Sequence, residues 1–292
     1  MIDYHLHLWS HDDSSVGYQL EQVAQYCEEA ARHGVNELAL TEHLYRFVEM
    51  RATVGDFWRR WGHEPTAPLM ADYFDFHARN SLDDYVAFAQ LAKSEGLPVK
   101  VGMEVDYYRD QMDDVAALLD QYPFDVLIGS VHWLNTWQFD DIDNEVHMAE
   151  WRTRDVDQSW AEYTLALEEL AAARAVDVLA HPDVIKVAGY VASDPSVHWD
   201  RMADAAAAVD VSVECSSAGW FKPVGEQYPA QGFLDRLVAR GVTFTTASDA
   251  HRRERVGSRA PDLATLLEAR GVTELATYER RQRIMVPMRV AP

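Results

Sequence analysis

The feature that most constrains this fold is the alternation of short apolar segments with longer amphipathic ones. Seven short runs have the length and composition of buried strands: residues 2–6, 37–41, 99–103, 126–131, 175–180, 211–214 and 243–247. Seven segments of helical periodicity follow them: residues 18–33, 82–95, 112–121, 158–174, 199–209, 230–240 and 261–270. Repeated strand–helix units build a parallel α/β sheet, which can be an open doubly wound sheet or a closed barrel.

Glycines and two long connections mark the boundaries of these units. Several predicted helices end in a glycine just before the next strand, as a helix end requires: Gly34, Gly96, Gly241 and Gly271. The connections at about 44–81 and 133–156 are long and rich in aromatic residues. Long connections of this kind are commonly functional, so we expect these two to form walls or lids over a site. The alternative is that they are peripheral surface insertions. A chain of 292 residues suits one domain spanning 1–292.

Charge and cysteine content exclude several classes of protein. The formal net charge of -22 disfavours electrostatic binding of nucleic acid over a broad surface. Two cysteines, Cys27 and Cys215, support neither a disulfide framework nor a thiolate metal site. The first residues lack the features of a signal peptide, and no apolar run approaches the roughly 20 residues that span a bilayer. We therefore predict a cytoplasmic protein that binds neither membrane nor nucleic acid; its oligomeric state is not predicted.

Histidines and carboxylates follow the ends of the predicted strands. His5 and His7 share one face of the first strand, because side chains at i and i+2 point the same way. The other strand ends carry Glu42 with His43, Glu104, His132, His181, and Asp249 with His251. Six of the seven strand ends therefore deliver a ligand type to one edge, which in a barrel is the edge that holds active sites. The pattern favours a closed or nearly closed barrel with a metal cluster at this edge.

The ligand types constrain the metal. Imidazole nitrogen and carboxylate oxygen without sulfur suit Zn, Mn or Fe better than Mg or Ca. His11 is a further candidate ligand, and Asp12 or Asp13 could take its place. Glu104, from the middle of the array, is the candidate for a carboxylate that bridges two ions. We expect two or three divalent transition-metal ions.

The segments that carry these residues are DYHLH, TEH, GMEVD, YPFDVLIGSVH, AHPD and SDAH. Together they resemble the PHP (polymerase and histidinol phosphatase) superfamily, most closely its histidinol-phosphate phosphatases, from His5 to about Gly257. The resemblance implies a distorted, TIM-like (β/α)7 barrel with a trinuclear metal site. It implies three ligand groups: His5, His7, Glu104 and Asp249; Glu104, His132 and His181; and His43 with His251, completed by His11 or a neighbouring aspartate.

The resemblance also implies the reaction, the hydrolysis of a small phosphomonoester such as L-histidinol phosphate. A hydroxide that bridges the metals would attack phosphorus directly, with Glu104, Asp249 and His251 as catalytic residues. A protonated His251 or Asp249, or an adjacent metal, would assist the leaving group. The candidates for holding the phosphate oxygens are Arg152, Lys186, Lys222 and Arg252. An acidic segment with Asp140, Asp141, Asp143 and Glu145 is the candidate for meeting the positive charge of histidinol.

Three alternatives remain at this level. A PHP-type phosphodiesterase or 3′–5′ exonuclease would use the same metals, although the charge of -22 disfavours a polymeric substrate. Amidohydrolase barrels also begin with His-x-His but commonly need a bridging lysine on strand four, where this chain has His132. A non-catalytic metal-binding descendant of such an enzyme would be expected to have lost ligands.

Overall fold

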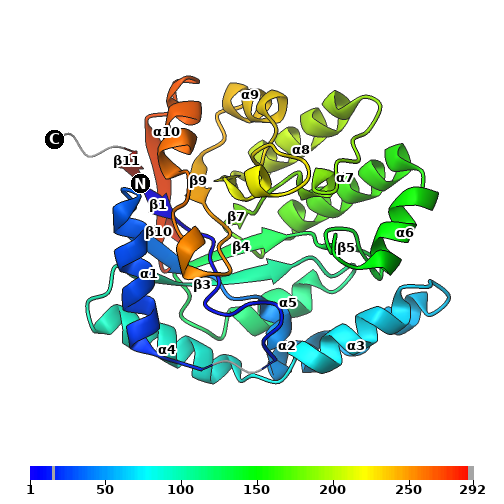
Figure 1. Ribbon diagram of the computed structural model, residues 1–292, viewed down its shortest axis with the longest axis horizontal. Helices are drawn as coiled ribbons and strands as arrows, with labels where there is room; N and C mark the ends of the chain where they lie inside the picture. The colour runs from blue at the N-terminus through cyan, green and yellow to red at the C-terminus, as the bar shows by residue number, and fades with distance from the viewer. Residues whose placement is uncertain (15–16, 289–292) are drawn as a thin grey trace.

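The computed structural model describes residues 1–14 and 17–288, and seven parallel strands form its centre (Figure 1). They are β1 (Ile2–Asp3), β2 (Glu37–Leu40), β3 (Val99–Asp106), β4 (Val126–Ser130), β7 (Val178–Leu179), β8 (Ser212–Ser216) and β9 (Phe244–Ala247), in this spatial order. The first and last strands meet: the amide of Tyr4 donates to the carbonyl of Thr246 at 3.0 Å, and the amide of Asp249 to that of His5 at 2.8 Å. The sheet is therefore a nearly closed (β/α)7 barrel, as the sequence predicts.

The strand β1 is shorter than predicted for a local reason. Beyond Asp3 the chain still runs beside β9, and Leu6 forms an isolated parallel bridge with Ala250. The amide of Leu6, however, donates to the side-chain hydroxyl of Thr41 at 3.0 Å instead of to a backbone carbonyl. This side-chain contact interrupts the regular ladder but keeps the chain at the barrel wall, and it carries His5 and His7 to the carboxyl end.

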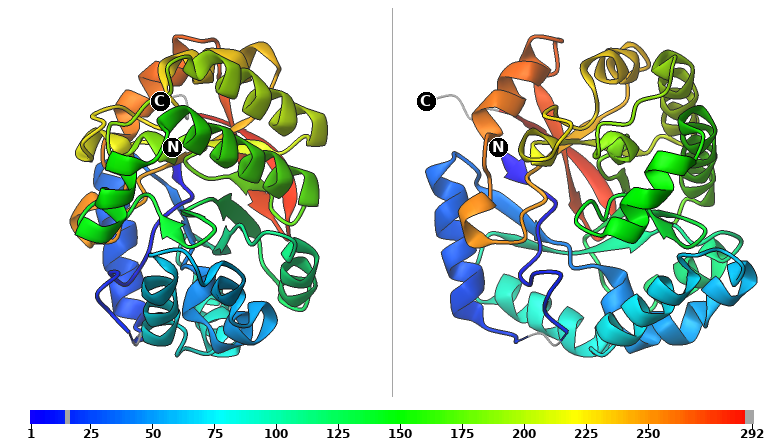
Figure 2. Two further views of the ribbon diagram at one scale, coloured as in Figure 1. Left: turned by 90° about the vertical axis from the view of Figure 1, so that its right-hand side faces the viewer. Right: turned by 45° about the vertical axis from the view of Figure 1, so that its right-hand side comes forward.

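Helices surround the barrel, as the two views in Figure 2 show. Seven of them correspond to the predicted helices: α1 (Leu20–Arg32), α4 (Leu82–Ser94), α5 (Met112–Leu119), α7 (Val156–Ala173), α8 (Pro195–Val209), α9 (Gln231–Ala239) and α10 (Ala260–Glu268). The helix α8 begins earlier than predicted because Asp194 caps it, accepting from the amide of Ser196, and Pro195 fits the first helical position. The four glycines predicted to end helices all have positive φ.

Both long connections are ordered and contain helices. The first holds η1 (Leu44–Arg46), α2 (Val48–Val54), η2 (Phe57–Trp61) and α3 (Ala67–His77); the second holds β5 (Trp133–Leu134), β6 (Trp137–Gln138) and α6 (Glu145–Thr153). Aromatic rings join the two insertions. The ring of Trp133 lies 6.1 Å from that of Phe74 and 6.2 Å from that of Phe57. The insertions therefore pack against each other beside the carboxyl end of the barrel.

A hairpin that the sequence analysis did not predict follows the last barrel helix. Its strands are β10 (Glu274–Glu279) and β11 (Gln282–Pro287), drawn in red in Figure 2. The amide of Arg281 in its turn donates to the carbonyl of Asp125 at 2.8 Å, just before β4. The turn therefore covers the amino end of the barrel, opposite the histidines. Most of β11 is exposed, so its sequence lacks the alternation that marks a half-buried strand. Among the described residues, no helix is long and apolar enough to cross a membrane.

Candidate metal centre

Eight of the nine predicted metal ligands converge at the carboxyl end of the barrel. Four groups of three residues have ligand atoms within 4.8 Å of one another: His7, His43 and His251; His5, Glu104 and His181; His5, His7 and Asp249; and His43, Glu104 and His132. Glu104 lies in β3, and the other residues lie in the segments that follow β1, β2, β4, β7 and β9. Parallel strands in a closed barrel bring their carboxyl ends to one rim, which is why residues far apart in sequence meet here.

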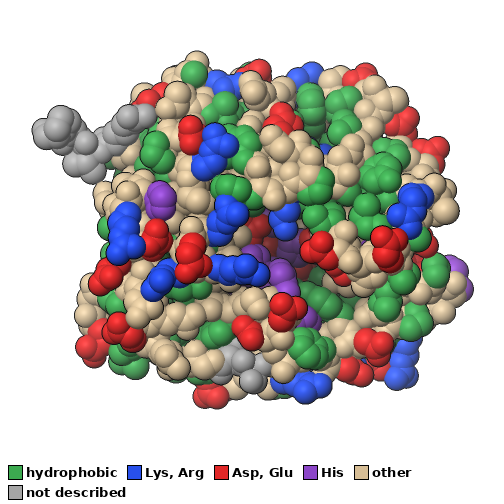
Figure 3. All heavy atoms as spheres, in the orientation of Figure 1, with side chains coloured by type: hydrophobic (Ala, Val, Ile, Leu, Met, Phe, Trp, Pro, Cys, Tyr) green, Lys and Arg blue, Asp and Glu red, His purple; other side chains and the backbone are tan. Residues whose placement is uncertain are grey.

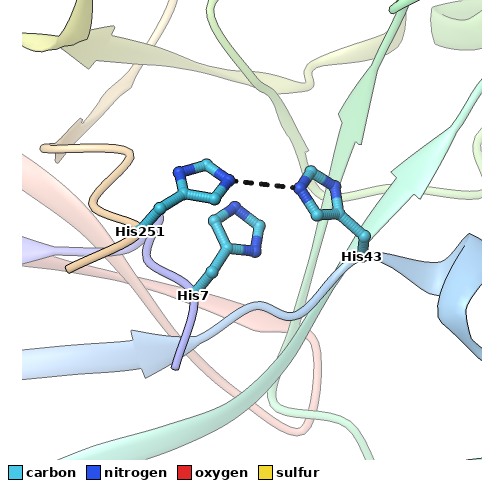
Figure 4. Close-up of side chains that lie close together, drawn as sticks. All are labelled: His7, His43 and His251. Carbon is cyan, nitrogen blue, oxygen red and sulfur yellow. Dashed lines mark hydrogen bonds between the residues drawn. The ribbon is translucent and has the colours of Figure 1, made fainter. Parts of the chain in front are cut away.

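Three pairs of imidazole nitrogens have the spacing of ligands to one ion. The Nε2 atoms are 3.2 Å apart in His5 and His7, 3.4 Å in His43 and His251, and 3.4 Å in His132 and His181. Two nitrogens bound to one ion at about 2.1 Å, at angles between about 90° and 110°, lie roughly 3.0–3.4 Å apart. Figure 4 shows the rings of His43 and His251 turned toward each other, with His7 beside them. The donor set and its spacing therefore fit transition-metal ions.

Glu104 lies between these pairs and is fully buried. Its Oε2 atom is 3.2 Å from Nε2 of His5 and 2.6 Å from Nδ1 of His43. Its Oε1 atom is 3.3 Å from Nε2 of His132 and 3.2 Å from Nε2 of His181. Burial alone would raise the pKa of Glu104, but the histidines around it hold that pKa well below its usual value. An ionised carboxylate whose two oxygens face different histidines is suited to bridging two ions.

Three further carboxylates lie beside the Nδ1 atoms of the histidines, on the side of each ring that faces away from the centre. Nδ1 of His5 lies 2.9 Å from Glu214, and Nδ1 of His132 lies 2.6 Å from Asp106. Nδ1 of His7 lies 3.4 Å from Glu42. An ionised carboxylate only accepts hydrogen bonds, so Glu214 and Asp106 fix the ring tautomer whose Nε2 lone pair faces the centre, and Glu42 lies in the corresponding place beside His7. The Nε2 atoms of His5 and His7 lie 3.2 Å apart at the centre, where one ion could bind both.

Two of these orienting residues, Glu214 and Asp106, are absent from the predicted site. Their signal is present in the sequence. Asp106 follows Glu104 by two residues, so both point to the same side of β3. Glu214 lies inside β8, where a fully buried carboxylate needs a partner. Glu42, which the strand-end pattern includes, faces the ring of His7 and is itself held by Arg46 at 2.9 Å.

Asp249 and His181 have unusual backbone conformations. Their φ angles are 51° and 24°, in the left-handed region that non-glycine residues avoid. Oδ1 of Asp249 is 3.6 Å from Nε2 of both His5 and His7. Burial would raise the pKa of Asp249, but the nearby His5 and His7 bring it well below its usual value. Strained residues of this kind cluster at functional sites, where the surrounding structure holds them in place.

His11 lies at the outer edge of the centre. Its ring stacks on that of His251, with centroids 4.3 Å apart, and its Nδ1 atom is 3.2 Å from the hydroxyl of Tyr45. Among the described residues it is in none of the four close ligand groups. The carboxylate of Asp13 accepts from the amide of Ser10, and Asp12 is exposed. Which of these three completes the third group stays a prediction.

The four candidate phosphate-binding cations have different surroundings. Arg152 is exposed on α6 and lies 3.0 Å from Glu145. Lys186 is buried, with its ammonium 3.0 Å from Asp183 and 2.8 Å from Glu226, so its charge is compensated within the protein. Lys222 and Arg252 are exposed in the segments after β8 and β9.

The acidic segment also divides into two parts. Asp140 and Asp141 are partly buried, whereas Asp143 and Glu145 are exposed. Burial raises the pKa of Asp140, and the charges of His132 and His181 oppose this shift. Of the four carboxylates, Asp140 therefore has the clearest electrostatic link to the histidines of the centre.

Comparisons with known proteins agree on one family. The model of the PHP domain family matches residues 5–218. A protein of Deinococcus radiodurans named a probable histidinol-phosphatase is 28% identical over 265 residues, which are 90% of this chain and 90% of that protein.

Two solved structures share the fold. The histidinol phosphate phosphatase of Lactococcus lactis, complexed with zinc, L-histidinol and phosphate, has a TM-score of 0.70 at 20% identity, covering 97% of this chain and 98% of its own. A proposed histidinol phosphatase of Listeria monocytogenes has a TM-score of 0.67 at 17% identity, covering 89% and 99%. At 20% and 17% identity, the likeness to these two structures shows a shared fold and nothing further.

Proposed function

The chain belongs to the PHP domain family, and on this premise we propose that it hydrolyses L-histidinol phosphate to L-histidinol and inorganic phosphate. The observation that carries the proposal is the centre itself, in which three imidazole pairs surround the carboxylate of Glu104. Such a donor set serves phosphoester hydrolysis, and the similarity to a probable histidinol-phosphatase covers 90% of both chains. A monoester of histidinol is therefore the first substrate to test.

We assign the ions to the three predicted ligand groups, with Zn, Mn or Fe as the metal. The Lactococcus lactis neighbour was complexed with zinc, which makes zinc the first metal to test. Bound divalent ions would lower the pKa of a coordinated water toward about 7 and offset charge on the phosphoryl oxygens. The chain contributes the geometry, because Glu42, Asp106 and Glu214 hold their histidines in one orientation before any ligand binds.

The protonation states of the proposed catalytic residues favour metal binding. Burial, with the charges of His7 and His11, lowers the pKa of His251 well below its usual value. The pKa of Asp249 is also held low, so both groups are unprotonated at neutral pH. An unprotonated ligand can bind a metal but has no proton to give. Assistance of the leaving group by an adjacent ion is therefore the stronger of the two predicted routes.

We propose that Lys222 and Arg252 hold the phosphate oxygens. Both are exposed beside strand ends that reach the centre, and within the described residues neither lies within 4.0 Å of a carboxylate. Lys186 and Arg152 already have acidic partners. For the positive charge of histidinol we propose Asp140, on the evidence of its coupling to His132 and His181. Both cysteines are free, and a cytoplasmic location remains part of the proposal.

The test is phosphate release by protein purified without chelator. Histidinol phosphate, p-nitrophenyl phosphate, bis-p-nitrophenyl phosphate and single-stranded DNA are compared side by side, and bound metal is measured on the same preparation. The expected result is a kcat/KM for histidinol phosphate that exceeds the other values. Preferred hydrolysis of the diester or of DNA would contradict the proposal, as would fewer than about two equivalents of transition metal in a site of this type.

A further inference from the structure

Two segments at the rim of the metal centre form one connected surface. They contain η4 (Ala218–Phe221), after β8, and η5 (Arg253–Arg255), after β9. The guanidinium of Arg255 lies 3.8 Å above the ring of Phe221, and that of Arg259 lies 4.1 Å above the ring of Trp220. The hydroxyl of Ser217 donates to the carbonyl of Ser258 at 2.8 Å. Two cation–π contacts and a hydrogen bond therefore hold the two segments together.

Part of the positive charge on this surface has no acidic partner among the described residues. Arg259 pairs with Asp262 at 3.0 Å, and Arg253 lies 3.7 Å from Glu254. For Lys222, Arg252 and Arg255 no carboxylate lies within 4.0 Å in the part of the chain that the structure describes, and all three are exposed. Among the described residues of this chain of net charge -22, these three cations without an acidic partner lie in two segments that contact each other. Figure 3 shows Lys and Arg side chains beside the histidines that are visible in the hollow of this face.

We propose that Lys222, Arg252 and Arg255 form a capture surface that draws the phosphate dianion of the substrate toward the metal centre. This rests on the proposed phosphomonoesterase function and adds Arg255 to it. The contact with Phe221 limits the motion of the guanidinium of Arg255 while leaving its N–H groups free for phosphate oxygens. Phe221 is 44% exposed, so the same contact presents an apolar ring beside the cations.

The net charge of the whole protein and the three cations at the rim act on the substrate over different distances. A net charge of -22 repels a dianion, but salt screens charges that are further apart than about 8 Å at physiological ionic strength. The three cations lie in the rim segments themselves, and a charged rim of this kind can raise association rates by about 10–1,000-fold. The capture surface therefore predicts that kcat/KM falls as salt is added. The net charge alone predicts that it rises.

The experiment compares three proteins of defined charge. The rim variant is K222Q/R252Q/R255Q. The control R32Q/R59Q/R201Q removes the same number of charges from exposed arginines that pair with Glu29, Asp56 and Glu168 on the outer surface. For each protein kcat and kcat/KM are measured for histidinol phosphate and p-nitrophenyl phosphate over a range of sodium chloride concentrations. Two single variants complete the set: R255Q removes the charge at that position, and R255K keeps it.

The expected result is that the rim variant loses about 10-fold in kcat/KM at low salt and that the loss shrinks as salt increases. The control keeps the wild-type salt dependence, and R255K stays closer to wild type than R255Q. Equal losses in the rim variant and the control, or a wild-type kcat/KM that does not fall with salt, would overturn the capture surface. Hydrolysis of p-nitrophenyl phosphate without hydrolysis of histidinol phosphate would instead overturn the proposed substrate, while the salt comparison still decides the capture surface. Hydrolysis of neither overturns both proposals.

Discussion

The two ends of the barrel both contain buried charge, but they neutralise it differently. At the amino end, Lys93 lies 2.8 Å from Asp125 and 2.8 Å from Glu279. At the carboxyl end, Glu104 is surrounded by histidines, and its Oε2 atom accepts no hydrogen bond within the described residues. Buried charge is stable only when it is paired. The amino end is therefore complete as it stands, whereas the carboxyl end is arranged for ions that the polypeptide does not supply.

The largest effect is expected from Glu104→Gln. The substitution keeps the size of the side chain but removes the negative charge that faces His5 on one side and His181 on the other. We expect kcat to fall on the order of 10³-fold and bound metal to fall with it, because an amide is a poor bridging ligand. Metal analysis, phosphate release and far-UV circular dichroism would be measured on the same samples. Wild-type metal content and activity in this variant would show that the two ends do not differ as described.

Chelation should distinguish the two ends in the wild-type protein. Removing one ion that binds only the folded state at about 100 times its dissociation constant costs roughly 3 kcal/mol, or about 4–5 °C in Tm for a protein of this size. Activity should be lost and should return when zinc or manganese is added. Calorimetry before and after dialysis against chelator measures the shift. An unchanged Tm together with full activity would contradict a bound metal centre.

Glu214→Gln should have an intermediate effect. The carboxylate of Glu214 holds Nδ1 of His5 at 2.9 Å, and the loss of such an orienting partner typically weakens metal binding by about 10–100-fold. Activity should recover at high metal concentration, because the ligands themselves are intact. Titration of apoprotein with zinc measures the affinity. Loss of activity that excess metal does not restore would point to a purely structural role.

Lys93→Met should affect the amino end alone. It removes the cation beside the buried carboxylate of Asp125, which still accepts from the amide of Val101. We expect a loss of about 1–2 kcal/mol in the free energy of unfolding, measured with urea, because the lysine is partly exposed. Metal content and kcat should stay within about 2-fold of wild type, since the metal ligands are untouched. A large fall in either would mean that the two ends are coupled.

The smallest effect is expected from Glu279→Gln and depends on pH. Hydrogen bonds from Lys100 and Lys93 lower the pKa of Glu279 to about 2. Since the folded-state pKa is depressed, its stabilisation is present above the unfolded value of 4.5 and is lost as pH falls toward 2. The side chain is 43% exposed, so solvent screening limits the effect to less than about 1 kcal/mol. Urea unfolding of metal-free wild type and variant should differ above pH 5 and converge in acid; a constant difference would contradict this assignment.

Much of the centre can be predicted because its information is local. Each ligand lies at or just after a strand, and the strands are recognisable from their composition. The hairpin β10–β11 could not be found in this way, because its exposed second strand lacks a hydrophobic pattern. The orienting carboxylates Glu214 and Asp106 were also missed, although both are buried acids in strands. Their orienting role depends on contacts with histidines that follow other strands, His5 for Glu214 and His132 for Asp106.

The sequence by itself determined the parallel α/β architecture, the residue types available as ligands and the edge at which they meet. These follow from periodicity and from the rule that parallel strands share one carboxyl end. Only the tertiary structure decided the 3.2–3.4 Å spacing of the imidazole pairs, the pairing of Lys186 with Asp183 and Glu226, and the contact of Arg255 with the ring of Phe221. The reason is physical: spacing and charge compensation depend on contacts between segments far apart in sequence, and no local pattern records them.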